Sequence, residues 1–166
     1  MRTQALPGRS DTASVAFRVA AAAGLLHAAA SLFWALGGRW QLESVGEWAA
    51  ALAQEHPVRV GLALGLITLV KASAAVVPLL NERHRSRFHQ QIRLGGWTGD
   101  VLLVGWGTLS SLSACAVLAG LVTPSNSYNR NTMIGHAFVW DPLFALWGGA
   151  LLTGLWLTRT LRGEQS

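Results

Sequence analysis

The chain has 166 residues and a formal net charge of +5, with 51% hydrophobic and only 13% charged residues. This charged share is about half that of a typical soluble domain, which is too little to cover so much apolar side chain. The composition therefore excludes an ordinary soluble globule. The basic residues stand at the ends of apolar runs and not on one soluble face, which excludes a nucleic-acid-binding surface.

Four apolar stretches are long enough to cross a membrane. A bilayer core about 30 Å thick needs roughly 20 helical residues, and residues 17–36, 58–80, 97–122 and 133–158 provide them. Strict alternation is absent, so helices and not barrel strands would satisfy the backbone in lipid. We therefore expect an all-α, multi-pass integral membrane four-helix bundle. It would form one domain over residues 15–160, with flexible cytoplasmic tails at 1–14 and 161–166.

Arginines concentrate on one side of these four stretches. They precede the first stretch, fill the segment between the second and third, and follow the last. The set is Arg2, Arg9, Arg18, Arg83, Arg85, Arg87, Arg93, Arg159 and Arg162. Because basic loops stay on the cytoplasmic side, we expect both termini inside (N-in/C-in), in the cell inner (cytoplasmic) membrane.

The first stretch also has features of a signal peptide, with an Ala-x-Ala-like site around residues 28–30. Its apolar run continues through Leu36, beyond what a cleaved signal needs, so we expect a retained span. Within it, His27, Ser31, Trp34 and Gly38 share one helical face. At this depth a histidine either hydrogen-bonds a neighbouring helix or belongs to a site.

The segment between the first two stretches predicts a short amphipathic helix on the outer interface, or a lid over the bundle. Apolar residues recur there near helical spacing beside three glutamates, a pattern typical of interfacial helices. The apolar residues are Trp40, Val45, Trp48, Ala49 and Leu52.

The second stretch carries a lysine, Lys71, far from either end. To place its charge at the membrane surface by snorkelling, the Lys71 side chain would have to extend to the level of Asn81. That level lies about 15 Å away along the helix, which is beyond the reach of a lysine. We therefore expect Lys71 to face the bundle interior and to have a buried partner. The candidates are Asp141, which we favour, and Asp100. Gly61 and Gly65 form a small-xxx-small pair, a pattern of close helix packing that would also serve a homo-oligomer.

The two aspartates each have a structural alternative. Asp100 would be an N-cap if the third helix began at Val101. Asp141 followed by Pro142 is typical of an N-cap and a first helical residue, or of a longer helix kinked at the proline that places His136, Trp140 and Trp147 on one face. In either case, we expect a break or kink between Asp141 and Pro142.

Other chemistry finds little support in the sequence. Cys115 is the only cysteine, which excludes an intramolecular disulfide and a cysteine metal cluster. His27 and His136 alone make a weak metal site, and no glycine-rich loop has the residues that cradle phosphate. We expect no metal and no cofactor.

Two motifs resemble a known family. They are His-x3-Ser-x2-Trp-Ala-Leu-Gly-Gly at residues 27–38 and Trp-Asp-Pro-Leu-Phe at residues 140–144. The chain resembles an uncharacterised family of small bacterial four-span membrane proteins, classed as a domain of unknown function, over roughly residues 15–160. The resemblance implies a four-helix bundle and supplies no activity.

These patterns favour a protein that holds a lipid-like or isoprenoid ligand in a Trp-lined polar cavity within the membrane. Its partners would be the lipid bilayer and a hydrophobic small molecule. Whether it is an enzyme stays open; in an enzyme, His27 or Asp141 would donate a proton. The expected ligand-binding residues are His27, Ser31, Trp34, Lys71, His136, Trp140, Asp141 and Trp147.

Two alternative functions remain. The first is an oligomeric ion- or proton-coupled carrier or channel, in which Lys71, His27 and Asp141 would form a relay. The second is a non-catalytic accessory membrane subunit that docks through Gly61 and Gly65. A cavity within one chain favours ligand binding, a polar seam between copies favours the carrier, and a filled core favours the accessory subunit.

Overall fold

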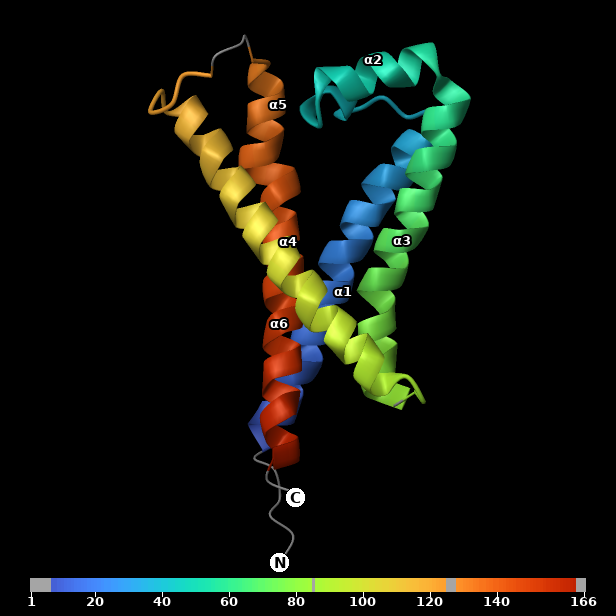
Figure 1. Cartoon of the computed structure of the whole chain (residues 1–166), viewed down its shortest axis with the longest axis vertical. Helices are drawn as coiled ribbons and strands as arrows, with labels where there is room; N and C mark the ends of the chain where they lie inside the picture. The colour runs from blue at the N-terminus through green and yellow to red at the C-terminus, as the bar shows by residue number, and fades with distance from the viewer. Residues whose placement is uncertain (1–6, 85, 125–127, 164–166) are drawn as a thin grey trace, which may run out of the picture.

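A computed structural model describes residues 7–84, 86–124 and 128–163, and these residues contain helices and no strand (Figure 1). The prediction of an all-α protein with four helices able to span a membrane is confirmed, and its orientation stays a prediction. The elements are α1 (Pro7–Ala35), η1 (Leu42–Ser44), α2 (Glu47–Glu55), α3 (Pro57–His84), α4 (His89–Leu118), α5 (Arg130–Gly135), the π-helical turn η2 (His136–Trp140) and α6 (Asp141–Gly163).

The long helices form two pairs that cross (Figure 1). Helix α1 packs beside α3, α4 packs beside α6, and α1 crosses α6 at the centre of the bundle. The two pairs diverge toward one end, where α2 lies crosswise; we call this the α2 end. The opposite end, where α1 begins and α6 finishes, is the terminal end.

Helices α1 and α6 form the centre of the bundle. In the most apolar 18-residue stretch of each candidate span, 44% is buried for α1 and 39% for the span Arg130–Arg159, which ends in α6. The share is 11% for both α3 and α4. The main apolar cluster combines residues of α1, one alanine of α3 and large residues of α6: Phe17, Ala20, Ala23, Ala75, Trp147, Leu151 and Leu155. Outward faces of α3 and α4 carry exposed leucines and valines, the surface that a membrane-spanning bundle presents to lipid.

Close helix packing involves Gly61 of the predicted pair and several glycines that were not predicted. A Cβ on Gly107 of α4 would lie 2.6 Å from the Asp141 carbonyl oxygen, and one on Gly24 of α1 would lie 2.7 Å from the Trp147 ring. Gly61 faces the Ala35 carbonyl oxygen of α1, whereas nothing lies within 4 Å of a Cβ on Gly65. Gly107 therefore allows α4 and α6 to approach closely, because only a hydrogen side chain fits there.

The arginine-rich segment 81–96 is mostly helical, in contrast to the predicted loop. Helix α3 continues to His84 and α4 already begins at His89. Arg93 explains the extension: its guanidinium donates to the Glu82 carboxylate, to Thr158 Oγ1 at 2.8 Å and to the Leu155 carbonyl at 2.8 Å. Arg93 thus joins α3, α4 and α6 at the terminal end.

The N-cap alternative for Asp100 is wrong, because α4 begins eleven residues earlier, at His89. The predicted tails lie partly outside the described residues, and from Pro7 onward the first tail is helical.

The expected break between Asp141 and Pro142 is absent, since the chain stays helical from Arg130 to Arg159, and a kink there stays a prediction. Asp141 has helical backbone angles (φ −77°, ψ −38°) and is not an N-cap. The helix accommodates the proline through the π-helical turn that immediately precedes Asp141. The i→i+5 bonding there widens the backbone where a proline ring would clash in an α-helix.

The predicted outer helix is present as α2, although it begins at Glu47 and not near Trp40. The residues before it form η1 and turns, and three contacts hold them in place. Trp34 Nε1 donates to the Trp40 carbonyl at 3.0 Å, and Thr132 Oγ1 of α5 donates to the Glu43 carbonyl at 2.8 Å. Asn129 donates to the Glu47 carboxylate at 2.7 Å.

Candidate functional site

A cavity of about 370 Å³ lies at the α2 end, between the diverging helix pairs and beneath η1 and α2. Nearly all of the residues singled out from the sequence line it: His27, Ser31, Trp34, Lys71, His136, Trp140 and Asp141. Trp147 does not, because it lies in the apolar cluster next to Gly24 and Ala75. We call this space the α2-end cavity.

Lys71 is held by two side chains of α1. Its Nζ lies 3.0 Å from His27 Nδ1 and 2.9 Å from Ser31 Oγ. His27 and Ser31 are one helical turn apart, so both face α3 at the level of Lys71. A charged lysine has only donors, so His27 Nδ1 then accepts, and the imidazole proton is on Nε2. Phe144 completes the surroundings, with its ring centroid 5.7 Å from Nζ.

The expected pairing of Lys71 with an aspartate is wrong as a direct ion pair. Within the described part of the chain, no carboxylate oxygen lies within 4.0 Å of Lys71 Nζ. The reason is the arrangement of the helices: α1 packs directly beside α3, whereas Asp141 projects from α6 and Asp100 from α4.

Asp141 is paired with His136 instead. His136 Nδ1 lies 2.9 Å from Asp141 Oδ2, and His136 Nε2 lies 3.4 Å from the Val45 carbonyl oxygen. Asp141 is only 1% exposed. In an α-helix, residues five apart point about 140° away from each other, so the two side chains could not meet. The π-helical turn between them brings them to one face, and such turns are frequent at functional sites.

Aromatic rings form much of the remaining wall. Trp34 and Trp140 meet edge to face with centroids 5.1 Å apart, and the rings of His27 and Phe144 are 4.0 Å apart. Both indole N–H groups are already used, Trp34 toward the Trp40 carbonyl and Trp140 toward Ser44 Oγ at 2.9 Å. Each of these two tryptophans therefore contributes the surface of its ring to the cavity wall.

Several cavity residues were missed from the sequence. Phe144 lies one turn after Trp140, and this spacing could have identified it. Trp106 of α4 gave no signal, because the hydropathy of that span does not tell which face is inward. Trp48 and Leu52 were assigned to the outer helix without a ligand-binding role, and both line the cavity.

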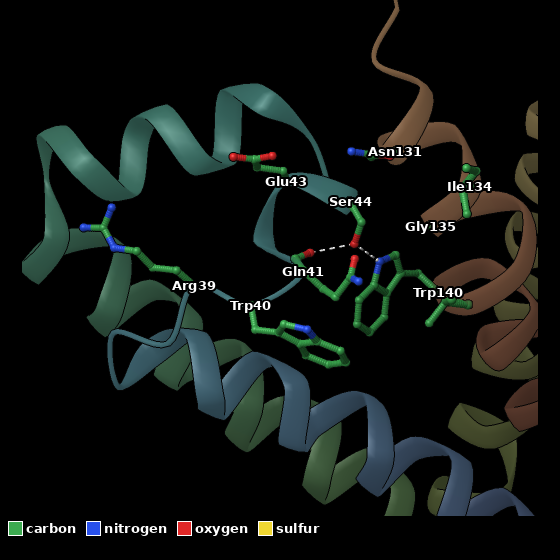
Figure 2. Close-up of a pocket in the computed structure, with 10 residues that line it drawn as sticks. Arg39, Trp40, Gln41, Glu43, Ser44, Asn131, Ile134, Gly135 and Trp140 are labelled. Atoms are coloured by element: carbon green, nitrogen blue, oxygen red, sulfur yellow. Dashed lines mark hydrogen bonds between the residues drawn. The ribbon is translucent and has the colours of Figure 1, made fainter.

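A second, more polar hollow of about 570 Å³ opens above, between η1 and α5. Figure 2 shows Ser44 between Gln41 and Trp140: its hydroxyl donates to the Gln41 carbonyl at 2.6 Å and accepts from the Trp140 indole. Arg39, Glu43 and Asn131 also line this hollow. Trp140 borders both the polar hollow and the α2-end cavity.

No cluster of three or more His, Cys, Asp and Glu side chains suited to a metal ion occurs among the described residues. The arrangement is a set of hydrogen-bonding groups on one side of an otherwise apolar space. The fold thus defines a small helical protein with four helices long and apolar enough to span a membrane.

The chain belongs to the family described as "Protein of unknown function (DUF3995)", whose sequence model matches residues 24–151. This confirms the resemblance to an uncharacterised family. The matched segment contains the cavity residues His27, Ser31, Lys71, His136 and Asp141. No curated protein and no solved structure matches the chain.

Proposed function

We propose that this protein binds a lipid-like or isoprenoid molecule in the α2-end cavity, with the polar end of the ligand at Lys71. The observation that carries the proposal is the position of Lys71: its amine, with His27, lies in the wall of a cavity lined mostly by apolar side chains. Ligand sites commonly combine apolar walls with a few converging polar groups.

Unused hydrogen-bond donors suggest what the polar end must carry. A lysine ammonium has three N–H donors, and His27 and Ser31 take two. His27 Nε2 is buried and has no partner among the described residues. Both groups border the cavity and both would donate. A ligand with an acceptor oxygen, such as a phosphate, carboxylate or carbonyl group, would satisfy them.

The rest of the cavity suits an apolar chain. Its walls include Trp48, Leu52, Leu64, Ile67 and Trp106, and a volume of about 370 Å³ falls within the usual range for ligand pockets. Trp106 of α4 lines the cavity and is nevertheless 67% exposed, so the cavity reaches a surface that in a membrane would meet lipid. The ligand would therefore enter sideways from the bilayer, in our proposal the cell inner membrane.

The same groups would support a reaction as well as binding. Asp141 or His27 would donate a proton, and the faces of Trp34 and Trp140 would stabilise a developing positive charge. The oligomeric carrier has less support, because the polar groups meet within one chain and Gly61 packs against α1.

Native mass spectrometry of the full chain, purified from membranes in mild detergent, tests the proposal. We expect a co-purifying lipid-like mass in the wild type and its loss in Lys71→Met, which keeps the length of the side chain and removes its charge. Leu69→Met is the matched control, because Leu69 lies on the same helix and is 67% exposed. Equal ligand retention in Lys71→Met and in Leu69→Met would overturn the proposal, provided that both variants unfold cooperatively.

A further inference from the structure

A third cavity, of about 340 Å³, lies toward the terminal end, between α3, α4 and α6. We call it the Asp100 cavity. It is separated from the α2-end cavity by two stacked rings of α6: Phe144 borders the first space and Trp147 the second, with ring centroids 6.4 Å apart.

Two polar groups in its wall lack partners. Asp100 is fully buried, and neither of its carboxylate oxygens accepts a hydrogen bond within the described residues. Trp147 is 3% exposed, and its Nε1 likewise donates to none of them. Buried polar groups are nearly always satisfied, and an ionisable side chain within a membrane helix is costly unless it is paired or used. Two unpartnered groups in one cavity wall indicate an occupant.

With Asp100 ionised, the occupant must offer a donor to the carboxylate and an acceptor to the indole N–H. An indole N–H only donates and an ionised carboxylate only accepts. A metal ion or an ammonium would serve Asp100 and leave Trp147 unsatisfied, and the described residues include no metal-type cluster here. A hydroxyl group can both donate and accept. The other walls are apolar or small, among them Val77, Pro78, Leu103 and Leu151, so the body attached to that hydroxyl must be apolar.

We propose that the Asp100 cavity binds an apolar alcohol, whose hydroxyl donates to Asp100 and accepts from Trp147. Glycines provide the room: Gly95 and Gly99 line the cavity, and nothing lies within 4 Å of a Cβ built on either. The alcohol site proposed here does not depend on the ligand site proposed for the α2-end cavity.

Photolabelling of the full chain in mild detergent tests this second site. The probe is dodecan-1-ol with a diazirine in its chain, compared with its methyl ether, which cannot donate. The labelled residues are mapped by mass spectrometry. We expect the alcohol to label the segments that line the Asp100 cavity, and the ether to label them about tenfold less, because a hydrogen bond to a charged group is worth enough for about that ratio.

Four variants sharpen the test. Asp100→Leu removes the carboxylate without leaving a buried charge, and Gly99→Leu fills the cavity; each should reduce labelling by the alcohol about tenfold. Gly105→Leu is the control, since it adds the same side chain to open space on the same helix and should label as the wild type does. Lys71→Met should also label normally, which separates this site from the α2-end cavity.

Equal labelling by alcohol and ether would overturn the proposal, since it would mean an apolar groove that ignores the hydroxyl. Absence of labelling in these segments would also overturn it, leaving water as the occupant. Loss of labelling in Lys71→Met with retention in Asp100→Leu would place the probe in the α2-end cavity and would equally count against it.

Discussion

Lys71 Nζ lies 3.0 Å from His27 Nδ1, so a lysine in the middle of an apolar helix is held by an imidazole and not by a carboxylate. Ser31, one turn further along α1, supplies the second contact. The three side chains join α1 to α3 at the wall of the α2-end cavity and leave donors for a ligand.

A double-mutant cycle should detect the contact between Lys71 and His27. We expect Lys71→Met and His27→Leu to show a coupling free energy of about 1–2 kcal/mol for unfolding in detergent, as residues in direct contact do. The cycle of Lys71→Met with Asp141→Asn should give a smaller value, because the two groups do not form an ion pair within 4.0 Å. A larger coupling with Asp141 than with His27 would contradict the observed contact.

Two replacements of Asp141 should distinguish the contribution of its hydrogen bond with His136 from the contribution of its charge. Asp141→Asn keeps an acceptor oxygen for His136 and should cost less than about 1 kcal/mol of stability. Asp141→Leu removes the acceptor and should cost about 1–3 kcal/mol. Thermal unfolding of both variants in one detergent measures the difference. If Asp141→Asn stays folded but loses the bound ligand, the charge itself is required in the site.

Two neighbouring glycines of α4 offer a matched test of helix packing. A methyl group at Gly107 would lie 2.6 Å from backbone atoms of α6, whereas at Gly105 it would meet nothing within 4 Å. Gly107→Ala should therefore destabilise the protein by about 1–3 kcal/mol through overpacking. Gly105→Ala should be neutral or slightly stabilising, because alanine favours a helix. Similar melting temperatures for the two variants would contradict the packing described for α4 and α6.

Cysteine labelling tests the orientation in the membrane. After Cys115→Ala, single cysteines are placed at Ser86, between α3 and α4, and at Gln54 in α2; both positions are exposed. The distribution of arginines predicts Ser86 inside and Gln54 outside. In intact cells an impermeant thiol reagent should label only the cysteine at position 54. Labelling at position 86 would reverse the orientation.

The sequence was sufficient for the helices and for most residues of the site. Hydropathy predicts the spans, and the spacing of His27, Ser31 and Trp34 predicts a shared face that does line the cavity. The partner of Lys71 was not predictable, because hydropathy does not tell which helices are neighbours. The pairing of His136 with Asp141 was also not predictable, because it depends on a π-helical turn that regular 3.6-residue periodicity does not represent.

Segment 81–96 was misjudged for a related reason. Its charged residues are typical of a loop, yet Arg93 is buried by contacts with a helix more than sixty residues later in the chain. The composition of the residues around Arg93 does not indicate so distant a partner. The same holds for Asp100, which local sequence presents as a helix cap and which the fold buries within α4.

The contacts of Arg93 also impose an order on biogenesis. Glu82 leaves the ribosome shortly before Arg93, whereas Leu155 and Thr158 are synthesised long after it. During translation the arginine therefore has a counter-ion from the preceding helix, but its hydrogen bonds to α6 form only after α6 has been synthesised and has packed against α4. These contacts at the terminal end of the bundle thus form later than the contact between Arg93 and Glu82. A nascent chain that stops before Leu155 leaves those guanidinium donors to water and lipid headgroups.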